Sequence, residues 1–141
     1  MTLMRFKDAL HFTTDEERER SFLITDPRED DNPIVFVNEA FLKLTVYTLD
    51  EVIGRNCRFL QGAETNPLTV TALGEAIQAR KRIIVDILNY KKDGSAFWNR
   101  LSLRPVFESD GSLRSFVGVQ QAIREDEASE TPQISSVPKR S

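Results

Sequence analysis

The sequence predicts an α+β fold, a five-stranded antiparallel sheet with helices on one face, preceded by a flanking N-terminal helix. Two hairpin signals support the sheet, because Asp93-Gly94 and Asp110-Gly111 each join two segments rich in apolar and β-branched residues. Capped helical patterns fill the chain between the second and third strand candidates, which is typical of an α+β domain. The five strand candidates are residues 22–26, 34–37, 82–92, 95–106 and 115–123.

Composition limits the class of protein. The 141 residues are 40% hydrophobic and 29% charged, which suits one globular domain, and we assign its core to residues 21–123. The net charge of -3 gives no basic surface of the kind that nucleic-acid binding needs. No apolar run approaches the ~20 residues that cross a membrane, and the N-terminus lacks a signal-peptide pattern. We therefore expect a cytoplasmic protein without direct contact to nucleic acid or membrane.

The first 20 residues predict an amphipathic flanking helix. Leu3, Phe6 and Leu10 recur at helical spacing, and a charged run follows at residues 15–20. This helix serves either as a cap on the domain or as a contact between two copies of the chain, and the sequence does not separate these roles.

Local signals define the next elements. Pro27 and the polar residues after it separate the first two strands, and Asn38 is positioned to cap a helix over residues 39–45. Thr48 and Glu51, three residues apart, form a capping box for a second short helix. Gly54 is the expected C-terminal stop of that helix.

A longer helix is predicted from Asn66-Pro67 to about Lys81. Proline is favoured in a first helical turn, and the apolar stripe of this segment faces one side. Gly74 interrupts the helix at a cost of about 1 kcal/mol relative to alanine. At the other end of the chain, residues 124–141 are charged and proline-containing with little to bury, so we expect a mostly disordered tail.

The main candidate for a functional site is residues 54–62, GRNCRFLQG, which hold the only cysteine. If this run is helical, Cys57, Leu60 and Gln61 share one face, and Arg58 points elsewhere. The alternative is that Cys57 is a small buried hydrophobe, the usual state of a free cysteine. One cysteine excludes an internal disulfide, and His11 as the only histidine leaves neither a zinc site nor a Cys-His catalytic pair.

Three amides stand among apolar residues of the predicted strands. Alternation places Asn89 and Asn99 on apolar strand faces, and Gln120 follows on the next strand. A buried amide without partners costs about 1 to 3 kcal/mol, so each needs a hydrogen bond. A flat heterocycle with an imide edge would supply three, and Gly118, without a side chain, would let it approach. The alternative is that the amides bond one another or the backbone.

These motifs resemble those of LOV (light-oxygen-voltage) domains, a branch of the PAS superfamily. The resemblance covers residues 22–120 and includes TDP at 25–27, DNP at 31–33, the run at 54–62, NY at 89–90, KDG at 92–94, FWN at 97–99 and GVQ at 118–120. It implies the PAS fold in a short, stand-alone LOV protein with flavin mononucleotide (FMN) as cofactor. Asn89, Asn99 and Gln120 would bond the ring edge, Asn56 and Gln61 the ribityl chain and Arg58 the phosphate, while Leu60 and Leu101 pack on the ring.

The resemblance also implies a function. Blue light would excite FMN to a triplet, Cys57 would add reversibly to ring carbon C4a with protonation of N5, and the protein would signal by a change of shape, without turnover. Two alternatives remain. The first is a PAS module that binds either another ligand or a flavin without productive photochemistry, and the second is a flavin redox enzyme. The flavin redox enzyme is disfavoured because the sequence has no dinucleotide fingerprint and no second redox cysteine.

One departure and one surface qualify this prediction. Many relatives carry a second phosphate-binding arginine where this sequence has Gly74, so riboflavin or FAD could replace FMN. The outer sheet face offers an apolar patch that needs covering. We expect both the 1–20 segment and a second copy of the chain to cover it, in a homodimer whose downstream partner is unknown. The predicted patch is Ile84, Leu88, Trp98, Val117 and Val119.

Overall fold

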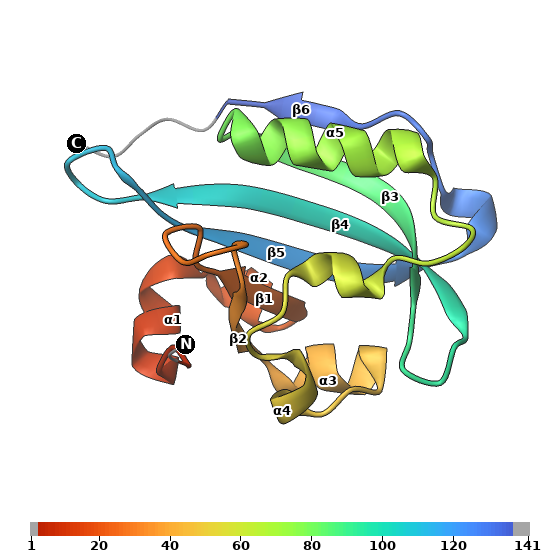
Figure 1. The fold of residues 1–141 in the computed structure, drawn as a ribbon, viewed down its shortest axis with the longest axis horizontal. Helices are drawn as coiled ribbons and strands as arrows, with labels where there is room; N and C mark the ends of the chain where they lie inside the picture. Colours follow the sequence, from red (N-terminus) through yellow and green to blue (C-terminus); the bar gives the residue numbers. More distant parts are fainter. Residues whose placement is uncertain (1–2, 137–141) are drawn as a thin grey trace.

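The computed structural model describes residues 3–136 and contains, within them, one six-stranded antiparallel sheet that curls around its helices (Figure 1). The strand order is β2-β1-β5-β4-β3-β6, so the first hairpin joins the C-terminal strands through the β1 and β5 pair. Five strands match the predicted ones and the sixth lies in the predicted tail. The bounds are β1 Ser21–Thr25, β2 Ile34–Val37, β3 Arg82–Tyr90, β4 Ala96–Phe107, β5 Leu113–Ile123 and β6 Gln133–Ser135.

The chain between β2 and β3 forms the helical layer on the inner face of the sheet. Its caps are those that the sequence predicts: the Asn38 side chain accepts from the Phe41 backbone NH, the Thr48 backbone NH donates to Glu51, and Asn66 caps the longest helix. These helices pack on two buried apolar clusters, one under α3 and η1 and one under α5. They are α3 Glu39–Thr45, α4 Leu49–Val52, the 3-10 helix η1 Cys57–Leu60 and α5 Pro67–Gln78.

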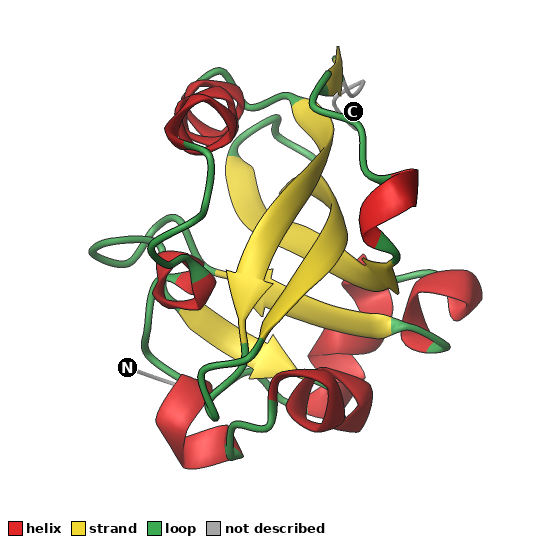
Figure 2. Cartoon of the chain, turned by 90° about the vertical axis from the view of Figure 1, so that its right-hand side faces the viewer, coloured by secondary structure: helices red, strands yellow, loops and turns green. Residues whose placement is uncertain are grey.

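The N-terminal segment covers the outer face of the sheet, so that helices lie on both sides of it (Figure 2). It forms two short helices, α1 Phe6–Phe12 and α2 Asp15–Arg18, where one was predicted. The break falls at Thr13-Thr14 because Thr14 caps α2 in a capping box with Glu17.

The apolar residues that predicted this helix are not the ones buried against the sheet. Leu3, Phe6 and Leu10 are exposed, by 62% for Phe6, while Met4 and Ala9 pack against β1, β2 and β5. The Met4 backbone NH donates to the Val35 carbonyl at 2.8 Å, which sets the entry of the chain and turns the other face of α1 toward the sheet.

A charged contact fastens the N-terminal segment to β4. The Arg104 guanidinium forms a two-pronged ion pair with Glu17, at 2.9 and 2.7 Å, and also donates to the Phe12 carbonyl. Both side chains are less than 20% exposed. The segment buries Val117 and Val119 of the predicted apolar patch, and the rest of the patch, Ile84, Leu88 and Trp98, is half-buried.

The described part of the C-terminal tail, residues 124–136, contains a 3-10 turn and a short strand, where the sequence predicted a mostly disordered segment. After the 3-10 turn η2, Glu125–Glu127, strand β6 pairs with the start of β3. The buried Asp86 explains part of this order, because its carboxylate accepts from Arg100 at 2.9 Å and from the Ser129 backbone NH at 2.8 Å. Residues 137–141 lie outside the described part of the chain.

Candidate functional site

A cavity of about 210 Å³ lies between the helical layer and the inner face of β3, β4 and β5. Nine of the ten predicted site residues line it, and Gly118 is the exception. The structure thus brings together residues from η1 and from three strands, while their roles toward a cofactor stay predictions. The lining residues are Leu23, Asn56, Cys57, Arg58, Leu60, Gln61, Val70, Leu73, Gly74, Ile77, Ile87, Asn89, Asn99, Leu101, Leu103 and Gln120.

Gly118 is not among the residues that line the cavity, and the expectation that a ligand approaches it stays a prediction. A Cβ at this position would lie 3.3 Å from methyl groups of Leu23 and Leu103 and 3.5 Å from Leu101. These three leucines line the cavity themselves. The missing side chain of Gly118 therefore lets these neighbours pack close to the sheet.

The amide cluster is buried and incompletely paired. Asn99 is 1% exposed and donates from Nδ2 to Asn89 Oδ1 at 2.9 Å, so these two amides do bond each other, as the alternative reading expected. Yet Asn99 Oδ1 has no hydrogen-bond donor within residues 3–136. An unsatisfied buried acceptor costs about 1 to 3 kcal/mol. A cofactor with an N–H in its ring edge would remove that cost, and the imide of a flavin has this group.

Gln120 is held by a residue that the sequence analysis did not single out. The Ser21 hydroxyl on β1 donates to Gln120 Oε1 at 2.8 Å, and Gln120 Nε2 lies 3.3 Å from the Gly118 carbonyl. Ser21 and Gln120 are register partners on adjacent antiparallel strands. Because they are 99 residues apart in the chain, no local signal predicted the pair.

Cys57 begins a single turn of 3-10 helix, which the Asn56 side chain caps by accepting from the Arg58 backbone NH at 3.0 Å. In a 3-10 helix residues i and i+3 eclipse, so Cys57 and Leu60 share the cavity face. Gln61 follows in extended conformation and reaches the cavity from beyond the helix. Burial raises the pKa of the Cys57 thiol, so the group keeps its proton near neutral pH.

At the polar end of the cavity, two lining residues contact the loop between β1 and β2. Arg58 donates from Nη1 to Asp31 Oδ1 at 2.9 Å and from Nη2 to Asp31 Oδ2. Asn56 Nδ2 donates to the Asp31 carbonyl at 2.8 Å. Two of the three residues that the resemblance assigns to the ribityl and phosphate groups thus bond Asp31. Asp31 lies 27 positions before Arg58 and was not predicted as a site residue.

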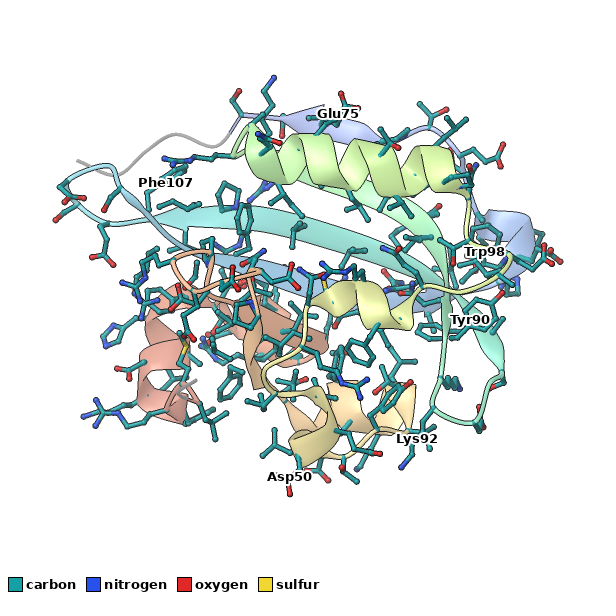
Figure 3. The ribbon with its side chains drawn as sticks, viewed as in Figure 1. Asp50, Glu75, Tyr90, Lys92, Trp98 and Phe107 are labelled. Atoms are coloured by element: carbon teal, nitrogen blue, oxygen red, sulfur yellow. The ribbon has the colours of Figure 1, made fainter. Side chains whose placement is uncertain are left out.

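Two glycines shape the surroundings of the cavity. A Cβ on Gly74, in α5, would have no atom within 4 Å, and the position lines the cavity. A Cβ on Gly62 would lie 2.3 Å from the Tyr90 ring, so only glycine fits there. The Tyr90 hydroxyl in turn accepts from the Glu64 backbone NH, and Figure 3 shows Tyr90 beside the loop that leaves η1.

Two further features, a metal site and a membrane-spanning helix, are absent from the described residues. Among residues 3–136, no group of three or more His, Cys, Asp or Glu side chains is placed to hold a metal ion. Within the same span, none of the helices has the length and apolar character needed to cross a membrane.

Comparison with known proteins identifies the fold. A family model described as a PAS domain matches residues 19–125. Phototropin-2 of Oryza sativa subsp. japonica is 52% identical over 108 residues, which are 77% of this chain and 12% of that protein. A blue-light-activated histidine kinase of Brucella abortus is 55% identical over 115 residues, 82% of this chain and 22% of the kinase. The chain therefore spans less than a quarter of the length of these relatives.

Solved structures agree. A light-oxygen-voltage domain studied with a flavin analogue superposes with a TM-score of 0.78 at 42% identity, covering 86% of both chains. The LOV domain of a blue-light activated histidine kinase from Erythrobacter litoralis gives 0.72 at 42% identity, over 75% of this chain and 97% of that one. The chain belongs to the PAS domain family. Within that family it is a LOV domain, as the sequence motifs predicted.

Proposed function

We propose that this LOV domain is a blue-light photoreceptor that holds FMN and bonds it reversibly through Cys57. The observation that supports this most directly is the juxtaposition of a protonated thiol and an unpaired amide acceptor in one apolar cavity, at Cys57 and Asn99. A buried thiol alone would indicate only that Cys57 packs as a small hydrophobic residue. An orphaned buried acceptor beside it calls for a partner with an N–H group.

Each lining residue has a role that follows from its position in the cavity. Asn89, Asn99 and Gln120 present donors and acceptors from three adjacent strands and orient a flat ring edge, while Leu60 and Leu101 exclude water from its faces. A bound flavin supplies the absorption of blue light and a ring carbon, C4a, that becomes reactive when excited. Cys57 would supply the thiol for a reversible bond to that carbon, and the proton of the thiol would move to the ring and return to sulfur when the bond breaks in darkness.

The choice of FMN follows from Arg58, which lines the polar end of the cavity as the single charged residue of its described lining. A guanidinium is well suited to a phosphate. Riboflavin and FAD stay as alternatives, because Gly74 supplies no second cation and neither Arg80 nor Lys81 is among the lining residues.

Absorption spectroscopy of the purified full chain tests the proposal. We expect a yellow protein whose blue band bleaches under blue light and returns in darkness. Cys57→Ala should keep the flavin and its fluorescence and lose the bleaching, since only the bond-forming atom is removed. Cys57→Ser is the matched control, because its hydroxyl is a poorer nucleophile, and it should behave like the alanine variant. Reversible bleaching in either variant would defeat the role of Cys57, and a yellow wild type that never bleaches would favour a flavin-binding PAS module without photochemistry.

The same proposal covers how the domain acts. It signals by a change of shape in the cytoplasm, without enzymatic turnover of its own, toward a downstream partner or domain. Its flanking segments are the route we favour, because the N-terminal segment leaves Leu3, Phe6 and Leu10 exposed. A second copy of the chain would cover these residues in a two-fold dimer.

Sedimentation at several concentrations, in light and darkness, tests the dimer. Phe6→Glu should shift the chain toward the monomer, whereas Lys7→Glu, the neighbouring exposed position, should not. A wild type that is monomeric at every concentration would remove the dimer from the proposal.

A further inference from the structure

We propose that Asp31 determines which flavin the site retains: by holding Arg58 it cancels most of the advantage that a phosphate gives, so that riboflavin is taken up alongside FMN. This inference deepens the proposed function and rests on it in one respect, that the cavity binds a flavin. The inference assigns a role to Asp31, which is not among the residues that line the cavity.

The first step is the charge balance at the polar end of the cavity. Arg58 is the single charged residue of the lining, and Asp31 faces it with two contacts between guanidinium and carboxylate. The Arg58 side chain lowers the pKa of Asp31, so the carboxylate is ionised at neutral pH. An incoming phosphate, with a charge of about -1.5 to -2, therefore meets a cation whose charge is already compensated.

The second step is that Asp31 stays close to Arg58. Its backbone carbonyl accepts from Asn56 Nδ2, and the next strand is joined to the same region, because the Ile34 backbone NH donates to the Arg55 carbonyl at 2.8 Å. A phosphate that takes over the guanidinium thus stays near the Asp31 carboxylate. Like charges at such proximity repel, and water and salt reduce this repulsion.

The third step is that the described lining offers no substitute cation. The cavity face of α5 is formed by Val70, Leu73, Gly74 and Ile77. The Arg58 and Asp31 side chains are 59% and 55% exposed, so their ion pair is weak enough for a phosphate to compete. The balance between phosphate and carboxylate at Arg58 then sets the preference for FMN over riboflavin.

The test is competitive loading of the full chain with equal excess FMN and riboflavin, followed by extraction and chromatographic separation of the bound flavins. Asp31→Asn keeps the side-chain shape and tolerates the left-handed backbone at this position, where φ is 66°. We expect it to raise the FMN to riboflavin ratio about fivefold at low salt, the upper range of a surface ion pair. That gain should fall as salt increases, because it is electrostatic.

Asp30→Asn is the matched control, since it removes the same charge from the adjacent exposed position, for which the described structure gives no ion pair. It should change the ratio less than twofold. Arg58→Gln should lower the ratio below that of the wild type, because Asp31 then acts on the phosphate alone.

An Asp31→Asn ratio equal to that of Asp30→Asn would overturn the proposal. Loss of both flavins from Asp31→Asn would also overturn it, because Asp31 would then be needed to build the cavity. A wild type that takes up neither flavin defeats the proposed function itself. Flavin binding without bleaching defeats only the photochemistry and leaves this inference standing.

Discussion

At the scale of single residues, Asn99 carries the polar argument for a cofactor. Its NH₂ group donates to Asn89, and its oxygen has no donor among the described residues. Under the proposed function, a bound cofactor would offset the cost of this unpaired acceptor. Strand alternation was enough to predict that Asn89 and Asn99 point inward, since period-two patterning is local.

The same scale includes contacts that no local pattern reveals. Ser21 and Asp31 reach Gln120 and Arg58 across the fold, and although Asp31 begins the DNP motif at 31–33, no local pattern indicates either contact. At Gly118 the sequence suggested room for a ligand, which stays a prediction, and did not indicate the leucine methyl groups that lie close to it. Pairings of this type depend on strand register and loop course.

Gly74 provides a prediction at this scale. Gly74→Arg should raise the FMN to riboflavin ratio, because the new side chain starts from open space on the cavity face of α5 and adds a second cation. It should also stabilise the helix by about 1 kcal/mol, the difference in helix propensity between glycine and a good helix former. The ratio is measured after denaturation and chromatography, with Gly74→Gln as the uncharged control. Equal ratios in the two variants would mean that the new charge does not reach the phosphate.

At the scale of elements, the inner helices were predictable because each carries its own start signal. Asn38, Thr48 and Asn66 all act as caps, and α3 has the predicted bounds. The packing of the N-terminal segment was not predictable, because apolar spacing indicates that a helix has one apolar side but not which side meets the sheet. Strand β6 was missed for a related reason, since three exposed residues pair with a strand some 50 positions earlier.

The end of α3 holds a local conflict that leads to a prediction. Val46 has φ of 68°, a left-handed conformation that costs a non-glycine residue roughly 1 to 2 kcal/mol, and its side chain is 48% exposed. Val46→Gly should therefore stabilise the domain by about 0.5 to 1 kcal/mol after the greater entropy of glycine is deducted, a rise in Tm of roughly 2 to 4 °C. Val46→Ala, which keeps a Cβ, should gain less. Thermal unfolding monitored by circular dichroism decides, and a lower Tm for the glycine variant would show that Val46 packing outweighs the strain.

At the scale of the whole molecule, the two flanking segments are both fastened to the outer face of β4. Arg104 bonds the N-terminal segment through Glu17, and Arg100 bonds the C-terminal one through the Glu127 carbonyl at 3.1 Å. Figure 3 shows Trp98, from the same strand, next to the C-terminal turn. The inner face of β4 lines the cavity through Asn99, Leu101 and Leu103. One strand thus connects the candidate cofactor site with both segments.

Gln120 is the residue through which we expect the light signal to enter this framework. Its oxygen accepts from Ser21, so its NH₂ group has a hydrogen to offer to an acceptor on a dark flavin ring. If Cys57 bonds the ring as proposed, N5 would become a donor, and the amide would have to turn its oxygen inward or leave a buried donor unpaired at a cost of about 1 to 3 kcal/mol. Rotation of the Gln120 amide would break its present hydrogen bond from the Ser21 hydroxyl. Ser21 directly follows the N-terminal segment, so the change would reach that segment. That energy is sufficient to bias a two-state element.

Gln120→Leu should therefore keep the reversible bleaching and reduce the light-dependent change in hydrogen exchange at residues 3–20 and 124–136. Ser21→Ala separates two routes, because it leaves the amide intact and removes only the hydroxyl that couples it to β1. We expect Ser21→Ala to reduce the response at residues 3–20 and to spare residues 124–136, which follow Gln120 on its own strand. A full response at both segments in the leucine variant would show that the signal bypasses Gln120. Equal losses at both segments in Ser21→Ala would mean that the two segments respond as one unit, joined through β4.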